Sequence, residues 1–363
     1  MQWREGTVLA ETTRWPGAVE YAVRLTDGGT VRALAYPAVV GEPMAGDRVL
    51  LNASALLRGL GTGGLAFVVA LPDRLPADPT APAGHIVKAR YTPQQQMFMA
   101  IDEQDSPHHD ALAAQGSAEA DLGGLPVVVA DLHSALPAVL AGIRAERPGA
   151  RVAYLMTDGG ALPLAFSRAV AGLVAAGWLH TTVTVGQAYG GDHEAVTLHS
   201  GLLAAQHVLG ADVAVVIQGP GNVGTGTPWG FSGVACGEAL NAVATLGGRA
   251  VAGLRVSDAD PRGRHRGISH HSLTAYGRVG LVPADVPVAE PTNPFRELVL
   301  GQARELAASA NGRLRVTEVP ADGLAEALDD SPVRLASMGR GLDEDPECFL
   351  ASAVTGRFAA GLV

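Results

Sequence analysis

Five segments of the chain combine Gly, Asp, His and hydroxyl residues in a way that suits ligand binding or proton transfer. They begin at Asp131, Thr157, Gly186, Gln218 and Ser257, and each follows a short apolar run. An ordinary strand-to-helix connection needs little more than one capping residue and one Gly. If the apolar runs are parallel strands, their carboxyl ends meet at the edge where open α/β sheets bind ligands. We therefore predict an active or ligand-binding site at this edge.

Three of these segments contain the residues that we single out as candidates for proton transfer. The candidates for catalysis are Asp158, Asp192, His193, His270 and His271. A carboxyl or imidazole group acts as a general acid or base when its surroundings bring its pKa near the working pH.

The fourth segment contains the pattern Gly219-x-Gly221-x-x-Gly224, which follows an apolar run as a dinucleotide fingerprint does. Glycines let backbone N–H groups approach a phosphate, and a following helix favours the anion. Two features depart from the fingerprint. Residues 225–230 delay the next helix, and Asp258 comes 39 residues after Gly219, farther than the usual spacing. Anion binding and a loop held only by Gly turns both stay open. The candidate ligand-binding residues in the Gly-rich segments are Gly159, Gly160, Gly219, Gly221, Gly224, Thr225 and Thr227.

The fifth segment differs from the rest of the chain in charge. Residues 249–278 contain six Arg and two acids, a balance of +4, whereas the whole chain carries −10. Arg262, Arg264 and Arg266 precede Ser269, a predicted helix N-cap, and guanidinium groups there suit a phosphate or carboxylate. In the alternative interpretation, Arg262 and Arg264 pair with Asp258 and Asp260 as a solvated surface network.

The histidines raise the question of a metal. His270 and His271 are adjacent, so on a helix they point about 100° apart and do not share one metal simply. Together with residues of other loops they could still assemble a metal site. No spacing such as His-Glu-x-x-His supports one, so the metal stays unknown. A second pair, His108-His109, lies outside the predicted strand edge. The other candidate ligands are Asp192, His193, Asp258, Asp260 and His265.

The elements that must position these residues form an α/β fold. After Gly84, continuous apolar runs alternate with Ala/Leu-rich stretches of helical length, as in a mainly parallel, doubly wound sheet. Strands are expected at 127–130, 152–156, 182–185, 213–217, 250–256, 314–319 and 333–337. Helices are expected at 135–146, 162–177, 194–209, 233–246, 295–309, 322–329 and 346–361.

Residues 1–84 instead predict a small all-β barrel. Two alternating runs flank Asp27-Gly28-Gly29, a hairpin signal because Asp-Gly tolerates positive φ. The oligonucleotide-binding type is one such barrel, but a charge of −1 over this segment argues against nucleic acid. We expect the α/β domain to span 85–363, after a linker in the Pro-spaced stretch 72–82.

Composition limits the class of protein. Gly (46) and Pro (23) are abundant, but 47% hydrophobic and 17% charged residues leave ample material for a core. The net charge of −10 argues against nucleic acid and membrane surfaces as partners. Cys236 and Cys348 form no disulfide framework. No signal peptide or 18-residue apolar run is evident. A cytoplasmic protein is expected, and its weakly charged helices are compatible with a homodimer.

Four segments also carry a resemblance: MTDGGALPLAFS (156–167), TVGQAYGGDHEAVTLHSGLLAAQHVLGADVAV (184–215), GPGNVGTGTPWGFSGVACGEALNAVATLGG (219–248) and DPRGRHRGISHHSLTAYGRV (260–279). With them the chain resembles an uncharacterised bacterial family, common in actinobacteria, known only as a domain of unknown function. Its members have about this length. The resemblance implies a cytoplasmic bacterial protein and carries over no catalytic residue.

The residues therefore favour an enzyme, or a degenerate enzyme, for a small anionic ligand, phosphorylated or nucleotide-like. Three alternatives remain at this stage. They are an NAD(P)-type oxidoreductase, a metal-dependent hydrolase, and a non-enzymatic ligand-sensing or scaffold protein.

Overall fold

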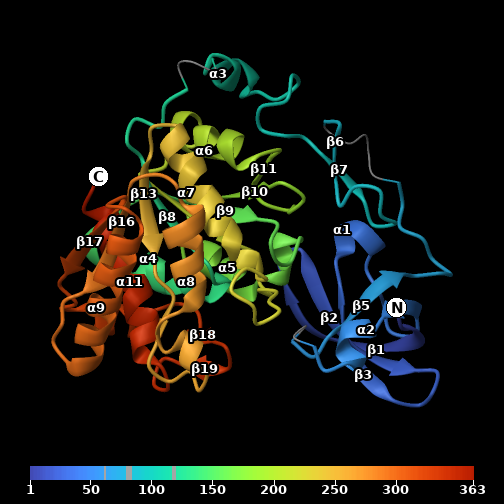
Figure 1. Ribbon diagram of the computed structural model, residues 1–363. Coiled ribbons are helices and arrows are strands. Elements are labelled where there is room, and N and C mark those ends of the chain that lie inside the picture. Colours follow the sequence, from blue (N-terminus) through green and yellow to red (C-terminus); the bar gives the residue numbers. More distant parts are fainter. Residues whose placement is uncertain (61–62, 79–83, 117–119) are drawn as a thin grey trace. The chain divides into compact units, whose positions relative to one another are not determined.

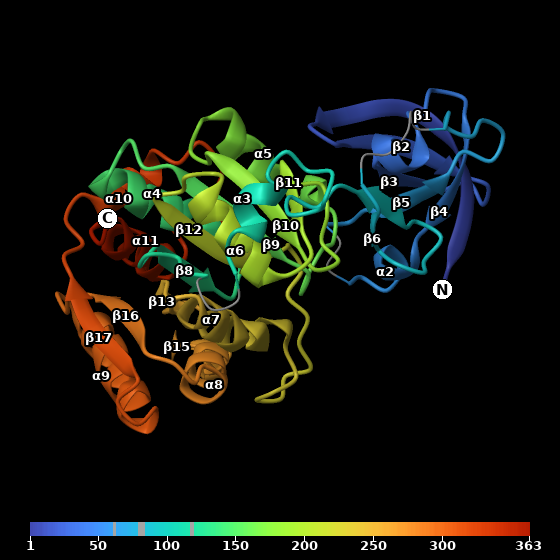
Figure 2. The same cartoon turned by 90° about the horizontal axis from the view of Figure 1, so that it is seen from above.

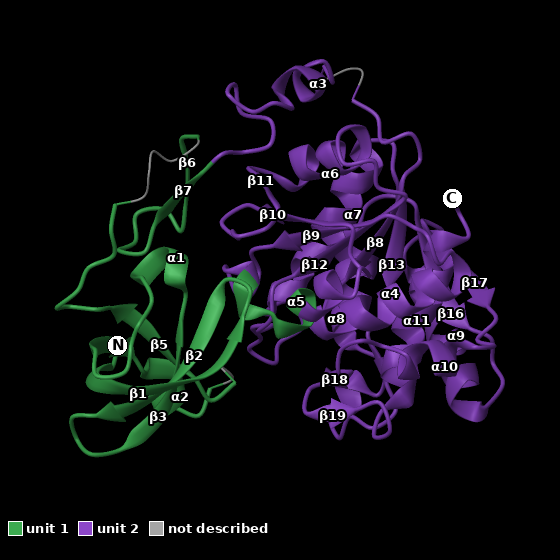
Figure 3. Ribbon diagram, turned by 180° about the vertical axis from the view of Figure 1, so that it is seen from behind, with its two compact units in different colours: residues 1–98, 165–171 green, residues 99–164, 172–363 purple. Residues whose placement is uncertain are grey.

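A computed structural model describes residues 1–60, 63–78, 84–116 and 120–363. The chain forms two compact units (Figure 3). Unit 1 comprises Met1–Phe98 and Ala165–Ala171, and unit 2 comprises Met99–Leu164 and Gly172–Val363. The predicted domain boundary after residue 84 falls inside unit 1. Of the predicted linker at 72–82, residues 79–82 lie outside the described part of the chain.

Unit 1 contains the predicted small barrel, which is closed in the order β1-β2-β3-β5-β4. The expected hairpin is present, since β2 and β3 pair antiparallel and Gly28 has φ 96°. Alternate side chains of the strands fill the barrel, with Val23, Ala33, Val49 and Leu51 fully buried. The elements of unit 1 are β1 (Trp3–Trp15), β2 (Ala18–Leu25), β3 (Thr30–Ala35), α1 (Pro37–Val40), β4 (Arg48–Asn52), α2 (Ser54–Leu57), β5 (Ala66–Ala70), β6 (Ile86–Lys88) and β7 (Gln96–Phe98).

Unit 2 is built on an eight-stranded sheet in the order β11-β10-β9-β12-β8-β13-β16-β17. Every neighbouring pair in it is parallel. The central strands are buried on both faces, which explains their unbroken apolar runs. The predicted α/β class with a parallel sheet is thus confirmed. The strands are β8 (Pro126–Ala130), β9 (Val152–Thr157), β10 (Thr181–Val185), β11 (His193–Ala195), β12 (Val213–Gln218), β13 (Arg249–Gly253), β16 (Ala284–Ala289) and β17 (Leu314–Val319).

Helices cover both faces of this sheet, as the doubly wound prediction requires (Figure 2). One layer contains α4, α10 and α11, and the other contains α6, α7 and α9. A short helix, α3 (His109–Ala113), precedes the sheet. The remaining helices are α4 (Leu136–Glu146), α5 (Arg168–Ala175), α6 (Leu198–His207), α7 (Ala235–Thr245), α8 (His270–Thr274), α9 (Pro294–Ser309), α10 (Leu324–Asp329) and α11 (Pro346–Ala360).

Some strand predictions differ from the structure. The strand predicted at 250–256 ends at Gly253, and Val256 belongs to β14 (Val256–Ser257), which pairs antiparallel with β15 (Gly267–Ile268). Residues 333–337 do not join the parallel sheet; instead β18 (Ala336–Ser337) pairs antiparallel with β19 (Arg340–Gly341). Sequence analysis missed β16, which contains Asp285 and Pro287. β16 pairs with β13 only at Val251–Asp285. Pro287 has no N–H to donate, but it lies outside this pair and so does not interrupt the pairing of the two strands.

Two predicted helices are shorter than expected. The 162–177 helix begins only at Arg168, after a 3-10 turn, and the 194–209 stretch begins as strand β11. Within the described residues, no helix combines the length and apolar character needed to cross a membrane.

The parallel sheet brings the loops after β8, β9, β12 and β13 to one edge. In Figure 1 this edge lies at the end of unit 2 that carries α8 and the β18–β19 hairpin. Helix α3 lies at the opposite end of the unit in both Figure 1 and Figure 3.

Candidate functional site

A buried carboxylate lies at the centre of the polar residues on this edge. Asp131 directly follows β8 and is 4% exposed. Its Oδ1 accepts a hydrogen bond from Asn222 Nδ2 at 2.8 Å, and its Oδ2 lies 2.8 Å from His271 Nδ1. Arg255 NH1 lies 3.5 Å from the same Oδ2, and Gln218 Nε2 donates to the Asp131 carbonyl at 3.0 Å. Asp131 therefore joins the loops that follow β8, β12 and β13.

The Asp131 carboxylate also lies at the start of the α7 segment. A Cβ on Gly233 would overlap Asp131 Oδ1, so only Gly allows this approach. Ser232 Oγ, at the same turn, donates to Asn222 Oδ1 at 2.8 Å, which holds the Asn222 amide toward Asp131. A carboxylate is favourable at the positive end of a helix. The position that a pyrophosphate takes in a dinucleotide fold is thus occupied by the protein's own carboxylate.

Three histidines gather beside Asp131. The ligand nitrogens of His265, His270 and His271 all lie within 4.8 Å of one another. Their ring centroids are 4.5 to 5.2 Å apart. The ring of Phe231 stacks on His271 with centroids 3.8 Å apart. The expectation that the side chains of His270 and His271 point too far apart to share one metal ion is therefore wrong. They occupy the first turn of α8, where side chains lean toward the N-terminus and the rings reach across to each other.

The backbone around Ser269 explains how His265 joins the cluster. Ser269 is the N-cap of α8, and its Oγ accepts from the His271 N–H at 3.2 Å. The same Oγ lies 2.7 Å from His265 Nδ1. One buried hydroxyl thus caps the helix and orients an imidazole at once. The predicted N-cap role of Ser269 is confirmed.

Burial and nearby cations keep two of these imidazoles neutral. Burial, aided by Arg255 and Arg262, lowers the pKa of His265 to about 3. Burial, the neighbouring His271 and then Arg264 lower the pKa of His270. Within the described residues, His270 Nε2 is buried without a hydrogen-bond partner. Neutral imidazoles present lone pairs that accept a proton or bind a metal ion.

Two of the three arginines predicted to bind an anion form ion pairs with nearby carboxylates. Arg262 binds Asp260 through Nε at 2.9 Å and NH2 at 2.7 Å, and these bonds hold the Asp260 pKa well below its usual range. Arg266 pairs with Asp258 at 3.2 Å. The surface-network interpretation thus fits Arg262 but fails for Arg264. Among the described residues, the Arg264 guanidinium has no ion-pair or hydrogen-bond partner.

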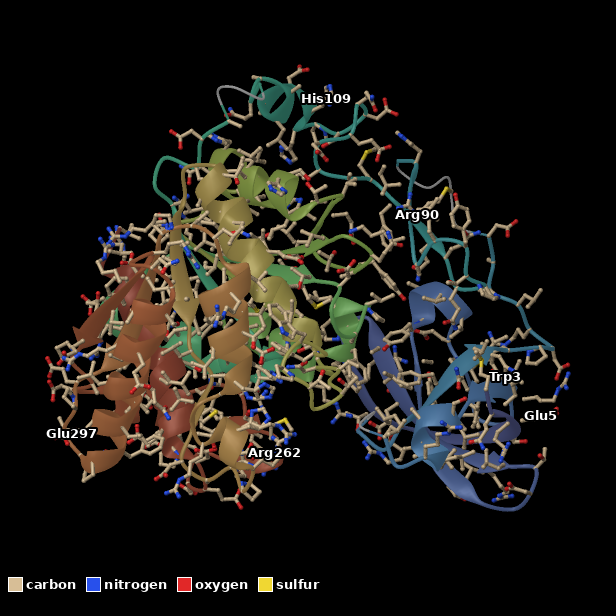
Figure 4. The ribbon with its side chains drawn as sticks, viewed as in Figure 1. Trp3, Glu5, Arg90, His109, Arg262 and Glu297 are labelled. Atoms are coloured by element: carbon tan, nitrogen blue, oxygen red, sulfur yellow. The ribbon has the colours of Figure 1, made fainter. Side chains whose placement is uncertain are left out.

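Arg264 also lies beside the Gly-rich loop. Its NH2 is 3.8 Å from the position that a Cβ on Gly226 would take. The Gly-rich loop and the Arg-rich loop therefore approach each other at an exposed guanidinium. The labelled Arg262 in Figure 4 marks this loop at the site end of unit 2.

The glycines after β9 and β12 serve mainly to pack two loops together. A Cβ on Gly159 would overlap Gln218 Oε1, and one on Gly160 would overlap the Gly219 carbonyl oxygen. The Ala161 N–H donates to the Pro220 carbonyl at 2.7 Å across the same contact. Close approach of backbones explains Gly160 and Gly219, and contact with the Gln218 side chain explains Gly159, without a ligand.

The rest of the Gly-rich loop folds on itself. Gly221 has φ 95°, and Gly224 forms an isolated bridge with Phe231. Thr225 Oγ1 donates to the Gly230 carbonyl at 3.2 Å, and Thr227 Oγ1 accepts from the Gly230 N–H at 3.1 Å. Helix α7 begins only at residue 235. This geometry differs from a dinucleotide fingerprint, in which the helix begins at the third Gly.

The catalytic candidates on the loops after β9 and β10 do not join the cluster. Asp158 Oδ2 accepts from the Gln187 N–H at 2.9 Å and ties those two loops together. The segment after β10 turns back, so Asp192 Oδ2 accepts from the N–H and Oγ1 of Thr182 at the start of β10. His193 is the first residue of β11 and is aligned with Val183 of β10. The expectation that Asp192 and His193 lie at the site is therefore wrong, because the chain reverses before β11.

The pair His108-His109 lies elsewhere in unit 2. His109 Nδ1 lies 2.8 Å from the Asp102 carbonyl oxygen, and the His108 ring is 6.1 Å from that of His193. Figure 4 shows the labelled His109 at the end of the unit opposite Arg262. This pair does not fold over the candidate site.

Comparison with known proteins places the chain in a family. Residues 32–356 match the family described as "Protein of unknown function (DUF3866)". The chain belongs to the DUF3866 family. No curated protein and no solved structure matches it. The resemblance noted in the sequence is thus confirmed, and the function of this DUF3866 protein must be argued from its site.

Two small cavities flank Asp131 in this DUF3866 chain, each of about 20 Å³. One is lined by Asp131, Arg255 and Cys348, the other by Gln218 and Cys236. Each has room for about one water molecule. Burial raises the pKa of the Cys348 thiol to about 11, so it is not poised as a nucleophile.

A larger pocket of about 530 Å³ lies at the carboxyl ends of β16 and β17. Five carboxylates line it, and its only cation, Arg296, pairs with Glu347 at 3.0 Å. The excess of carboxylates makes this pocket unfavourable for a small anion.

Sequence reasoning missed several residues that the structure brings into the site. Asp131 is the first residue after a buried strand, and that position alone could have singled it out. Nothing in the local sequence relates Arg255 or Asn222 to Asp131, because Asp131 lies more than 90 residues away from each of them. The sequence indicates His265 only as one of several candidate metal ligands.

Proposed function

We propose that this DUF3866 protein binds a small anionic molecule, phosphorylated or nucleotide-like, at the carboxyl ends of its parallel strands and acts on it as an enzyme. In this proposal the Arg264 guanidinium holds the anion, and the imidazoles of His265, His270 and His271 face the reacting group. Two free thiols, Cys236 and Cys348, are in keeping with a cytoplasmic location.

The observation that carries the proposal is the Arg264 guanidinium beside the histidine cluster. Among the described residues this guanidinium has no ion-pair or hydrogen-bond partner, and the pKa values of His265 and His270 are lowered. Arg264 and His270 interact electrostatically, and Arg264 lies against the Gly226 backbone. A free guanidinium is suited to a phosphate or carboxylate, which it grips with paired hydrogen bonds. Since the chain is otherwise acidic, the local positive charge also favours anions over other ligands at this point.

The second support is preorganisation. His271 is stacked on Phe231 and joined to Asp131, and His265 is joined to Ser269, so neither ring needs to be ordered by the ligand. Reactive groups held in place before binding are typical of enzyme sites. A pure sensing site requires no such oriented imidazoles.

The test is anion binding by Arg264→Ala. Isothermal titration of the full chain with inorganic phosphate, pyrophosphate and AMP should detect binding of at least one of them. Loss of a charge-assisted hydrogen-bonding group costs about 1.5–3 kcal/mol, so affinity should fall about 10- to 100-fold.

Arg304→Ala is the matched control, because Arg304 is exposed and pairs with Glu318 of β17. It should leave affinity unchanged, and Arg266→Ala should weaken it much less than Arg264→Ala. The proposal fails if none of the three anions binds at millimolar concentration, or if Arg264→Ala binds them as tightly as the unaltered chain.

A further inference from the structure

We propose that His265, His270 and His271 form a binding site for one divalent transition-metal ion of the zinc class. Their ligand nitrogens already lie within 4.8 Å of one another in the metal-free arrangement. In a tetrahedral site with Zn–N bonds of about 2.0–2.1 Å, ligand nitrogens lie about 3.3 Å apart. Small rotations of the side chains close that difference.

Hydrogen bonds to the outer residues occupy Nδ1 in two of the three rings. His271 Nδ1 faces Asp131 at 2.8 Å and His265 Nδ1 faces Ser269 Oγ at 2.7 Å, which leaves Nε2 of each ring for the metal. Metal-binding histidines commonly donate their other N–H to a carboxylate or similar oxygen. The arrangement of Asp131 and His271 is of this kind.

His270 supplies the most direct sign that a ligand is missing from the cluster. In the described part of the chain its Nε2 is buried and has no hydrogen-bond partner. An unsatisfied buried polar atom is costly. A metal ion between the three rings satisfies it.

Arg255 competes for one of these nitrogens. Its NH1 lies 3.0 Å from His271 Nδ1 as well as 3.5 Å from Asp131 Oδ2. With the proton on Nδ1, His271 donates to Asp131 and its Nε2 is free for a metal; with the proton on Nε2, Nδ1 accepts from Arg255. Asp131 is the nearer partner and favours the metal-binding tautomer. The negative charge of Asp131 also reduces the repulsion between Arg255 and a bound cation.

The chemistry of the ligands selects the ion. Three imidazoles suit Zn²⁺, Co²⁺, Ni²⁺ or Cu²⁺, whereas Mg²⁺ and Ca²⁺ prefer oxygen ligands. Three protein ligands leave the fourth position open for water or substrate, as in catalytic rather than structural zinc sites. Arg264 interacts electrostatically with His270, so we expect an anion bound at that position to meet both cations. This catalytic role depends on the proposed function above, but metal binding does not.

The experiment measures Co²⁺ and Zn²⁺ binding to the full chain after chelator treatment, in phosphate-free buffer. We expect one Co²⁺ per chain, the visible absorption of a four-coordinate ion, and displacement by Zn²⁺. His270→Asn should weaken binding by at least about 100-fold, since losing even an outer partner costs 10–100-fold. Its fold should persist, because His270 Nε2 makes no hydrogen bond within the described residues.

His199→Asn is the control, because His199 is an exposed histidine on α6 outside the cluster. It should bind Co²⁺ like the unaltered chain. The proposal is overturned if less than stoichiometric metal binds, or if His270→Asn, His265→Asn and His271→Asn all retain full affinity. Phosphate titration of the chelator-treated chain separates the two proposals. If the chain binds metal but no anion, the metal site is supported and only the proposed function is refuted.

Discussion

Asp131 is the residue on which the candidate site depends most. It contacts the amide of Asn222, the imidazole of His271 and the guanidinium of Arg255, three side chains from two other loops. Its burial makes each contact stronger than it would be in water. We regard it as a positioning residue, because it acts through His271 rather than on a ligand.

Asp131→Asn tests this role. The amide keeps the size of the side chain but lacks the negative charge that orients the Nδ1–H of His271. We expect Co²⁺ affinity to fall about 10- to 100-fold, with an altered visible spectrum of the bound ion. The spectrum distinguishes positioning from a general loss of stability, which chemical denaturation measures separately.

Asp212→Asn is the matched change, because Asp212 precedes β12 and pairs with Arg151 at the opposite edge of the sheet. It should leave the Co²⁺ spectrum unaltered. Equal spectra for the unaltered chain and Asp131→Asn would show that Asp131 does not orient His271.

Among the elements, the α4–α11 pair has the closest packing. A Cβ on Gly142 would overlap the carbonyl oxygen of Ala353, and one on Gly356 would overlap that of Val139. Both glycines lie within helices, where Gly is ordinarily unfavourable. Their presence is explained by the backbone contact between the two helices, of which α11 also lies against β8 and β13.

Gly142→Ala should destabilise the protein by about 1–3 kcal/mol, because the added methyl group forces the two helices apart. Gly301→Ala is the contrasting change. Gly301 lies within α9 with open space around it, so Ala there should stabilise by about 0.5–1 kcal/mol. Urea denaturation of both variants checks the opposite signs. If Gly142→Ala left the free energy of unfolding unchanged, the contact between the helices would not require Gly at this position.

For the molecule as a whole, buried neutral histidine makes stability depend on pH. Burial lowers the pKa of His133 to about 4, while the unfolded chain has the ordinary value of 6.5. The folded chain therefore binds fewer protons than the unfolded chain between these values. Stability is full above pH 6.5 and falls as the pH drops from 6.5 toward 4.

One such group contributes at most about 1.4 kcal/mol per pH unit. The free energy of unfolding, measured by urea denaturation between pH 7 and pH 5, should fall less steeply for His133→Asn than for the unaltered chain. His199→Asn, at an exposed position, should keep the original slope. Identical slopes for all three proteins would rule out His133 as the cause.

The sequence by itself determined the existence of the barrel and most of the strand and helix order of unit 2, with β11, β16 and residues 333–337 as exceptions. Both depend on local patterns: unbroken apolar runs such as Val127–Ala130 indicate buried parallel strands, and Asp27-Gly28 indicates a hairpin turn. Ser269 was likewise found locally, because an N-cap is a property of neighbouring residues. Local signals were weakest at β16, where Asp285 and Pro287 interrupt the apolar pattern.

Only the tertiary structure decided which polar residues work together. Nothing in the spacing relates Asp131 to His271, 140 residues later, and nothing predicts that the chain turns back to carry Asp192 and His193 away from the edge. Arg262 pairs with Asp260 and Arg266 with Asp258, whereas Arg264 has no such partner among the described residues. These outcomes depend on side-chain rotamers and on contacts between distant segments, and such contacts form only when the sheet has brought its loops together.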